Sequence, residues 1–352
     1  MIKLKWILII FLPIQWGLIK LLKNYPLFVE FHYSQKIYPL FFQLQAFFLS
    51  KLPFSFGDLA YGLGFIYLIL FGIQSFKNPA KRKTLLLNFF ALLSLVFLFF
   101  QLHWGLNYYR LPLQKKLNYP TTYSEEELAH TLDFLISSTN NLQSQLAPND
   151  STAVIIPYSK EEIKILLESE FNFNLSDFKV TPYLKNSMWS TLLSYMGFAG
   201  YLNPFTLESQ VNSNIPKLNY STTAAHEMAH QLGIASETEA NFVAYQTTIT
   251  HPDPFIKFAG YSFALGYCYN ELLKANSDSA KKKIARLNKG VLKNYQQLSI
   301  FWKKFKNPFE PYFKKSYDTY LKANGQQIDI LSYNEMVSMV VAYTLNKELT
   351  TD

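Results

Sequence analysis

The chain has 352 residues, of which 17% are aromatic and only 16% are charged, a composition typical of a membrane portion joined to a folded domain. Its net charge of +8 does not indicate a nucleic-acid-binding protein, because residues 1–102 hold ten Lys and Arg against two acids, whereas residues 103–352 hold 23 of each sign. The single cysteine, Cys268, excludes an intrachain disulfide framework and a zinc site built from cysteines.

Three hydrophobic segments predict membrane-spanning helices near the N-terminus. The first, residues 6–22, has two lysines before it and no small-residue cleavage site after it, which favours an uncleaved anchor over a signal peptide. The second and third, residues 55–74 and 85–102, are each long enough to cross a bilayer. Residues 23–54 are aromatic but too polar at their start to span, so we expect an amphipathic segment on the membrane surface.

The short basic loop at residues 75–84 predicts the orientation of these helices. It carries four Lys and Arg side chains, and short basic loops stay in the cytoplasm. The first span then begins in the cytoplasm, and the chain after His103 lies outside it. One observation opposes this topology, because residues 20–54 carry four lysines and would also lie outside.

Residues 103–352 have a globular composition, and we expect one domain that is mostly helical with a small sheet. Caps and apolar periodicity indicate helices at residues 124–146, 160–170, 221–233, 236–249 and 255–274, followed by a largely helical C-terminal part. Strands are expected at residues 178–183 and within residues 194–215.

An H-E-x-x-H motif that begins at His226 predicts a metal site on a helix. Residues four apart lie on one helix face, so His226 and His230 can present two imidazole nitrogens to one ion. Glu227 can then turn its carboxylate toward a water at that ion. We expect Ser221 or Thr222 to cap the start of this helix.

Two acids shortly downstream, Glu237 and Glu239, are the candidates for a third metal ligand. The four residues from Ser236 to Glu239 also form a capping box, in which Glu239 would reach back to the Ser236 amide. This leaves Glu237 for the metal, with Asn241 one turn further on to hydrogen-bond a ligand. In the alternative, Glu239 binds the metal and Glu237 only favours the helix N-terminus.

An ordinary solvated helix face with two histidines would give the same motif, so the prediction depends on its surroundings. The helix caps and the two acids within nine residues favour the metal site. The polar residues on both sides of the motif place it in the soluble domain, which excludes an intramembrane protease.

The motif together with residues 237–241, Glu-Thr-Glu-Ala-Asn, resembles the gluzincin branch of zinc metallopeptidases. The resemblance implies His226, His230 and Glu237 as zinc ligands and Glu227 as catalytic base. Asn241 then stands where gluzincins have an aspartate, and it orients its partner without adding charge. The gap between His230 and Glu237 is also shorter than in typical gluzincins. The match to metzincins is only partial, because their third histidine would fall at Ser236.

A closer resemblance covers nearly the whole chain. The segments that carry it, in order behind the three spans, are LPFSFGDLAYG, WGLNYYR, GYLNPFTLESQVN, HEMAHQLGIASETEANFVAY and DTYLKANGQ. They are similar to a bacterial membrane family designated domain of unknown function 3810, which is grouped with zincin peptidases. The resemblance implies a zincin-like α+β domain behind a helical membrane anchor, and it implies no biological role.

From these residues we expect zinc-dependent hydrolysis of a peptide or protein substrate. Glu227 would take a proton from the attacking water and pass it to the leaving amine. Tyr261, Tyr245 and His251 are candidate donors to the oxyanion, although packing explains each of them as well. Residues 200–210 could form a strand along which an extended peptide docks through backbone pairing, or an ordinary aromatic core segment.

A second class of function stays open at this point. The protein would then be a membrane-tethered scaffold or binding protein with a structural or vestigial zinc site, which Glu227 argues against because such a site needs no base. In both cases we expect a multi-pass protein of a bacterial inner membrane, with the lipid bilayer as a partner and residues 103–352 outside the cytoplasm. The sequence indicates neither the substrate nor an oligomeric state.

Overall fold

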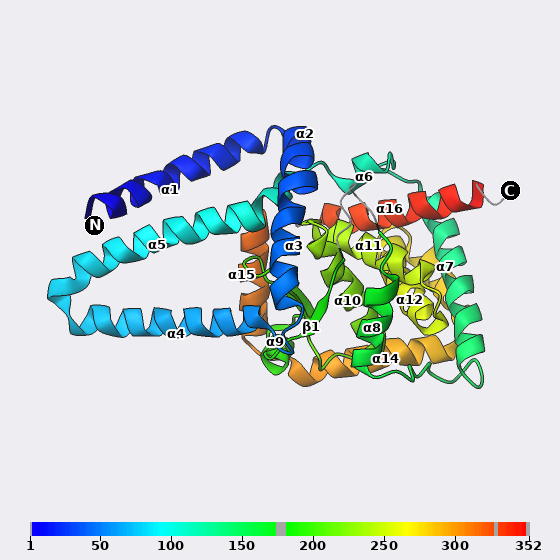
Figure 1. Cartoon of the computed structure of the whole chain (residues 1–352). Helices are drawn as coiled ribbons and strands as arrows, with labels where there is room; N and C mark the ends of the chain where they lie inside the picture. Colours follow the sequence, from blue (N-terminus) through cyan, green and yellow to red (C-terminus); the bar gives the residue numbers. More distant parts are fainter. Residues whose placement is uncertain (1, 174–180, 327–329, 350–352) are drawn as a thin grey trace.

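The computed structural model describes residues 2–173, 181–326 and 330–349. Among these residues, three helices are long and apolar enough to cross a membrane, namely α1 (Ile2–Leu22), α4 (Phe56–Lys77) and α5 (Arg82–His103). Figure 1 shows them extending away from a helical domain, which lies at one end of the bundle. The structure thus forms a helix over each of the three predicted spans.

A polar contact joins α1 to α5 inside this apolar bundle. Gln15 Nε2 donates a hydrogen bond to the Ser94 hydroxyl at 2.9 Å, and both side chains are buried. An unpaired amide would be costly in a bilayer, where no water satisfies it. The contact satisfies the amide nitrogen of this glutamine, whereas its Oε1 has no partner among the described residues.

The N-terminus and the loop between α4 and α5 lie together at the end of the bundle that is far from the domain (Figure 1). This loop contains the 3-10 turn η2 (Pro79–Lys81) and the basic side chains between Lys77 and Lys83. The basic loop and the domain therefore lie at opposite ends of the bundle, which is the relative arrangement that the charge pattern predicts.

A continuous helical segment lies at the boundary between the bundle and the domain. It comprises α2 (Pro26–Phe28), the π-helix η1 (Val29–Ile37) and α3 (Tyr38–Leu49), and Figure 1 shows α3 crossing the direction of α4 and α5. One face of the segment is buried in a core cluster with domain residues. The other face exposes the apolar side chains of Phe31, Leu40, Leu44, Phe47 and Phe48. The segment is amphipathic as predicted, but its buried face is a contact with the domain.

The domain follows from residue 103 and is mostly helical, as predicted. Two short helices, η3 (Gly105–Tyr109) and α6 (Leu113–Lys116), lead out of the bundle. The helices that follow in the described residues are α7 (Glu125–Leu146), α8 (Lys160–Glu170), α9 (Ser190–Met196), α10 (Lys217–Gln231), α11 (Glu237–Thr250), α12 (Pro254–Ala275), α13 (Ser277–Ile284), α14 (Lys289–Phe305), α15 (Glu310–Ala323) and α16 (Ile330–Leu349). Helices α7, α11, α12 and α16 pack around one core that includes Leu132, Phe242, Leu265 and Val340.

A small sheet packs against α10. Its central strand β3 (Ser209–Val211) is parallel to β1 (Leu184–Asn186) and antiparallel to β2 (Gly200–Leu202), so the order is β1-β3-β2. The prediction of strands and turns within residues 194–215 is confirmed by β2 and β3. Residues 178–180 of the strand predicted at residues 178–183 fall outside the described residues, residues 181–183 are not in a strand, and β1 begins directly after them.

The helix that carries the H-E-x-x-H motif begins earlier than predicted. Pro216 holds the cap position of α10, and its ring restricts the backbone there. The hydroxyl groups of Ser221 and Thr222 instead donate to the carbonyls of Lys217 and Asn219, one turn back along the helix. The predicted cap at Ser221 or Thr222 is therefore wrong.

The next helix, α11, begins after Ser236 as predicted, but only half of the expected capping box forms. The Ser236 hydroxyl accepts the N–H of Glu239 at 3.5 Å. The Glu239 carboxylate does not return to the Ser236 amide. It accepts the N–H of Leu113 at 2.5 Å instead, because this amide is at the start of α6 and has no partner within its own helix.

Candidate metal centre

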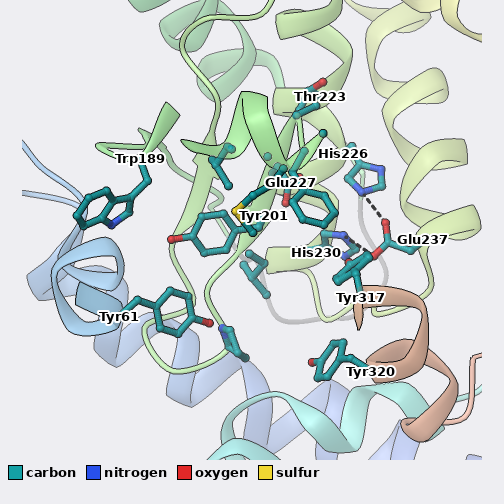
Figure 2. Close-up of a pocket in the computed structure, with 18 of the residues that line it drawn as sticks. Tyr61, Trp189, Tyr201, Thr223, His226, Glu227, His230, Glu237, Tyr317 and Tyr320 are labelled. Atoms are coloured by element: carbon teal, nitrogen blue, oxygen red, sulfur yellow. Dashed lines mark hydrogen bonds and ion pairs between the residues drawn. The ribbon is translucent and has the colours of Figure 1, made fainter. Parts of the chain in front are cut away.

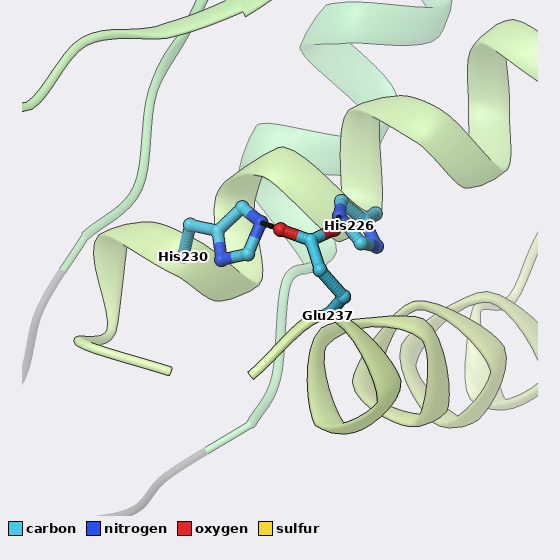
Figure 3. A group of neighbouring side chains, drawn as sticks. All are labelled: His226, His230 and Glu237. Carbon is cyan, nitrogen blue, oxygen red and sulfur yellow. Dashed lines mark ion pairs between the residues drawn. The ribbon is translucent and has the colours of Figure 1, made fainter. Parts of the chain in front are cut away.

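Three side chains from α10 and α11 converge on one point, as Figure 3 shows. Nε2 of His226 lies 3.2 Å from Oε2 of Glu237, and Nε2 of His230 lies 3.7 Å from Oε1 of the same carboxylate. One ligand atom from each residue lies within 4.8 Å of the other two. Atoms this close can share one ion that is about 2.1 Å from each of them.

The tight turn between α10 and α11 brings the glutamate back to the histidines. Gly233 in this turn has φ +76°, a left-handed conformation that suits glycine. Arg110 holds the turn from outside, because its Nη1 donates to the carbonyls of Leu232 at 3.1 Å and of Gly233 at 2.8 Å. The conformation of the metal centre therefore depends on a side chain that follows directly after the membrane bundle.

Hydrogen bonds on the far side of each imidazole orient both rings. His226 Nδ1 lies 2.8 Å from Asn241 Oδ1, and His230 Nδ1 lies 2.6 Å from the carbonyl oxygen of Ile234. An oxygen acceptor at Nδ1 requires the proton there, which leaves the Nε2 lone pair of a neutral ring for a metal. Asn241 thus contacts a candidate ligand, as the sequence predicts.

Of the two acids that the sequence offers as third ligand, the structure brings Glu237 to the histidines and holds Glu239 elsewhere. Glu239 is buried and its carboxylate faces α6. Burial raises the pKa of Glu239 to about 7, although the Leu113 N–H and the charge of Arg110 oppose this shift.

Glu227 lies on α10 and is only 4% exposed. Its Oε2 has no hydrogen-bond partner among the described residues. Burial raises the pKa of Glu227 to about 8, an effect that the charge of His226 weakens and that of Glu237 strengthens. A buried carboxyl group with a free oxygen beside the candidate ligands is positioned to exchange a proton with a group in the cavity.

The protonation states of Glu237 and His230 suit a metal site, whereas His226 is held partly by its pairing with Glu237. Burial alone would raise the pKa of Glu237, but the hydrogen bond from His226 and the charges of both histidines lower it to about 2. Burial alone would lower the pKa of His226, but its pairing with Glu237 raises it. Burial lowers the pKa of His230 to about 4. Glu237 is therefore a carboxylate and His230 a neutral imidazole, as metal ligands must be.

The candidate ligands and Glu227 line a cavity of about 1020 Å³ (Figure 2). The other walls come from α4, α5, α9, β2, α12 and α15. Most of the lining side chains are apolar or aromatic, among them Tyr61, Phe65, Phe100, Trp189, Tyr201 and Tyr320. This volume is at the upper end of the range of small-molecule sites, and it can hold several residues of an extended chain.

Strand β2 is an edge of the sheet within the described part of the chain, and it lines the cavity. The carbonyl of Ala199 accepts the N–H of Asn212, directly after β3, and the N–H of Asn203 donates to the carbonyl of Glu208, directly before β3, so these two residues face the sheet. The antiparallel pattern then turns the backbone groups of Gly200 and Leu202 toward the outer edge. Docking of an extended peptide along residues 200–210 stays a prediction, and β2 supplies the sheet edge that it requires.

The wall that α4 forms is bonded to the sheet. The Glu208 carboxylate accepts the first two N–H groups of α4 at 3.1 and 2.5 Å. Asp58 on α4 accepts from the N–H of Met188 at 2.7 Å and from the hydroxyl of Tyr201. The sheet and the membrane helix therefore hold one another in place at the cavity.

A family model described as a protein of unknown function (DUF3810) matches residues 33–341. The chain belongs to the DUF3810 family. The match includes α4, α5, the three candidate ligands and Glu227 in this DUF3810 protein, whereas α1 lies outside it. No curated protein and no solved structure matches the chain. The family resemblance inferred from the sequence is confirmed, and the family description carries no activity.

The three candidate oxyanion donors do not line the cavity of this DUF3810 protein. Tyr245 and Tyr261 lie in the core that α7, α11, α12 and α16 share, where both are buried. His251 lies beyond the end of α11, and its Nε2 is 3.1 Å from the carbonyl oxygen of Leu166 on α8. These three residues therefore pack against other parts of the domain, which is the alternative that the sequence also allowed.

A tyrosine hydroxyl that the sequence did not single out contacts the candidate metal centre of this DUF3810 chain. Tyr317 on α15 donates to Glu237 Oε1 at 2.8 Å (Figure 2). Burial and the charge of Glu237 raise its pKa, so the phenol stays protonated. Tyr320, one turn further, lines the same cavity and lies 3.1 Å from the hydroxyl of Tyr108. The spacing of Tyr317 and Tyr320 on one helix face was the signal available in the sequence.

Proposed function

We propose that this protein is a membrane-anchored zinc peptidase with a zincin-like domain. The convergence of His226, His230 and Glu237 beside the buried Glu227, inside a large cavity, carries the proposal. Two imidazoles and one carboxylate are a common donor set for zinc and leave a fourth position open. The contacts at both Nδ1 atoms support the fit, because they leave Nε2 of each ring to face Glu237.

Bound zinc would supply a polarised carbonyl and a water whose pKa is lowered toward neutrality. Glu227 takes the proton from the attacking water and later gives it to the leaving amine. Its position supports this role, because a buried carboxyl group that lines the cavity beside the candidate ligands can exchange a proton with the reacting groups.

Two further features support peptide hydrolysis in particular. The Tyr317 hydroxyl can donate to the oxygen that gains negative charge in the transition state, because it already lies against a candidate ligand. The outward backbone groups of Gly200 and Leu202 can hold an extended substrate as an added strand beside α10. A polypeptide offers the matching backbone groups, which other hydrolase substrates lack.

The alternative function is a membrane-tethered scaffold with a structural zinc site. A structural site encloses zinc with four protein ligands, and the group found among the described residues has three. In a scaffold, the buried carboxyl group of Glu227 would also have no chemical role, because a structural zinc site needs no base. Both observations favour the peptidase.

We further propose that the domain lies outside the cytoplasm of a bacterial cell. The separation of the basic α4–α5 loop from the domain along the bundle supports this orientation, because such loops are retained in the cytoplasm.

The test uses the full chain reconstituted in nanodiscs, with zinc content and hydrolysis of a peptide library as readouts. We expect the Glu227→Gln variant to keep its zinc and to lose at least a factor of about 10² in rate, because the base is gone while the ligands remain. The His226→Ala variant should lose both zinc and activity. Full hydrolysis by Glu227→Gln would overturn the base assignment, and a wild-type protein that neither binds zinc nor hydrolyses peptides would overturn the function.

A further inference from the structure

The cavity that contains the metal centre continues to the membrane helices. Tyr61, Gly62 and Phe65 of α4 and Phe100 of α5 line it together with Glu227. Figure 2 shows Tyr61 close to the bundle helices, on the opposite side of the cavity from His226. One end of this cavity is therefore made of residues that belong to the membrane anchor.

The helix geometry gives the depth of this end. Helix α4 has 22 residues. At about 1.5 Å per residue it is about 33 Å long, close to the hydrocarbon thickness of about 30 Å. Phe65 is nine residues from the start of α4, hence about 13 Å from the domain end of the helix. Its side chain is 66% exposed, so the cavity wall is continuous with a surface that faces lipid.

The domain elements on either side of the cavity also expose apolar side chains. Trp189 and Leu192 at α9 line the cavity and are exposed, and Trp189 lies against α4, where it is 3.4 Å from the position of a Cβ at Gly62. Tyr312 on α15, the helix that supplies Tyr317, and Phe309 directly before that helix are exposed as well. Exposed aromatic residues next to membrane helices are typical of a surface that meets the bilayer.

We propose that the substrate of this site is a polypeptide anchored in the same bilayer, and that the bond cut lies next to its membrane anchor. The inference rests on the peptidase function proposed above and adds the class of substrate. The apolar anchor enters along α4 and α5, and the extended segment that follows pairs with β2 beside Glu227. A lipid alone does not fit, because it has no backbone groups to pair with Gly200 and Leu202.

The experiment compares two probe pools on the reconstituted full chain. One pool consists of randomised octapeptides fused to a Leu-Ala transmembrane helix, and the other consists of the same octapeptides without that helix. The variant Gly62→Phe places a ring at the membrane end of the cavity, where a Cβ meets only the Trp189 ring within 4 Å. Gly64→Phe is the matched control, because Gly64 is on the same helix at a similar depth, does not line the cavity, and has nothing within 4 Å of its Cβ position.

We expect the anchored pool to be cut at least about tenfold faster than the free pool, with cleavage next to the helix. The ratio of the two rates should fall about tenfold in Gly62→Phe and stay unchanged in Gly64→Phe. If anchored peptides were cut faster only because the membrane concentrates them, the ratio would stay unchanged in both variants. Equal rates for both pools, or a ratio that Gly62→Phe leaves unchanged, would overturn the proposal.

A binding readout keeps this inference separate from the peptidase function. The Glu227→Gln variant carries a photoreactive phenylalanine analogue either at Phe65 or at Phe76, which is on α4 but does not line the cavity. Crosslinking of the anchored pool at Phe65 and not at Phe76 supports the inference even if neither pool is hydrolysed. Equal crosslinking at the two positions, or none at Phe65, contradicts it even if free peptides are hydrolysed.

Discussion

Gly200 on the edge strand lies directly against Glu227 on the motif helix. A Cβ at residue 200 would come 2.7 Å from Oε1 of Glu227 and 2.9 Å from its Cγ. Any side chain at this position therefore has to displace either the base or the strand. The contact links the two elements on which the proposed peptide hydrolysis would depend, since the same glycine has backbone groups at the outer edge of the sheet.

This contact predicts that Gly200→Ala reduces hydrolysis by at least about tenfold without loss of zinc, because the base shifts while the ligands stay. The extra methyl group should cost about 1–3 kcal/mol of stability. Thermal unfolding, zinc content and hydrolysis rate check this together. The control is Gly266→Ala on α12, where the nearest atom to a Cβ is 4.0 Å away. Wild-type activity in Gly200→Ala would contradict the role of the contact.

The two candidate ligand acids respond differently to neutralisation. We expect Glu237→Gln to weaken zinc binding by at least about tenfold, because a carboxylate ligand is lost. Glu239→Gln should leave zinc affinity near the wild-type value, since an amide oxygen can still accept the Leu113 N–H. A chelator competition assay on the two variants measures both affinities. The reverse result would move the ligand role to Glu239.

Tyr317 should matter for the transition state more than for binding. We expect Tyr317→Phe to lower kcat by about 10²-fold or more while zinc content and KM change little, because one donor to the oxyanion is lost. Tyr320→Phe is the matched control on the same helix, since its hydroxyl contacts Tyr108 rather than a ligand. If both variants keep the wild-type kcat, Tyr317 is a lining residue and nothing more.

The acid stability of the protein should depend on Glu30. Burial alone would raise the pKa of Glu30, but the hydrogen bonds and charge of Arg110 and the hydrogen bond from Lys116 lower it to about 2. Because the folded state lowers this pKa, the ionised form stabilises the fold above about pH 4.5, and this contribution is lost as the pH falls toward 2. Thermal unfolding in detergent between pH 6 and pH 2.5 measures the loss.

Two variants check the origin of this effect. Glu30→Gln should unfold at a temperature that varies less with pH over the acid range, because the titrating group is gone. Arg110→Ala leaves the Glu30 carboxylate buried without its main partner and should cost about 3 kcal/mol or more. It should also weaken zinc binding, since Arg110 holds the turn at Leu232 and Gly233. An equal pH dependence in Glu30→Gln and the wild type would contradict this assignment.

The local part of the metal centre could be predicted because the helix period alone places His226, Glu227 and His230. The same holds for the three membrane helices, which long apolar runs reveal without any tertiary information. Glu237 was favoured over Glu239 by a capping argument that the structure supports only in part. Glu239 is indeed held away from the histidines, but the group that holds it is the Leu113 amide of a distant helix.

The remaining features depend on tertiary packing, which no local pattern marks. Tyr317 reaches the site because α15 folds back over the cavity, whereas Tyr245 and Tyr261, closer to the motif in sequence, pack into the core. The contacts of Asp58 and Glu208 between α4 and the sheet were equally hidden, because each of these acids resembles an ordinary polar residue at the end of a helix or strand.

The bond between Glu208 and the start of α4 has a mechanical consequence. Lys185 on β1 adds to it, because its Nζ donates to the carbonyl oxygens of Ser50 and Leu52 in the link between α3 and α4. A domain on a flexible tether swings and rotates over the lipid surface. Here hydrogen bonds join the sheet to a helix that is long and apolar enough to span the bilayer, so His226, His230 and Glu237 are held at one constant height relative to the membrane.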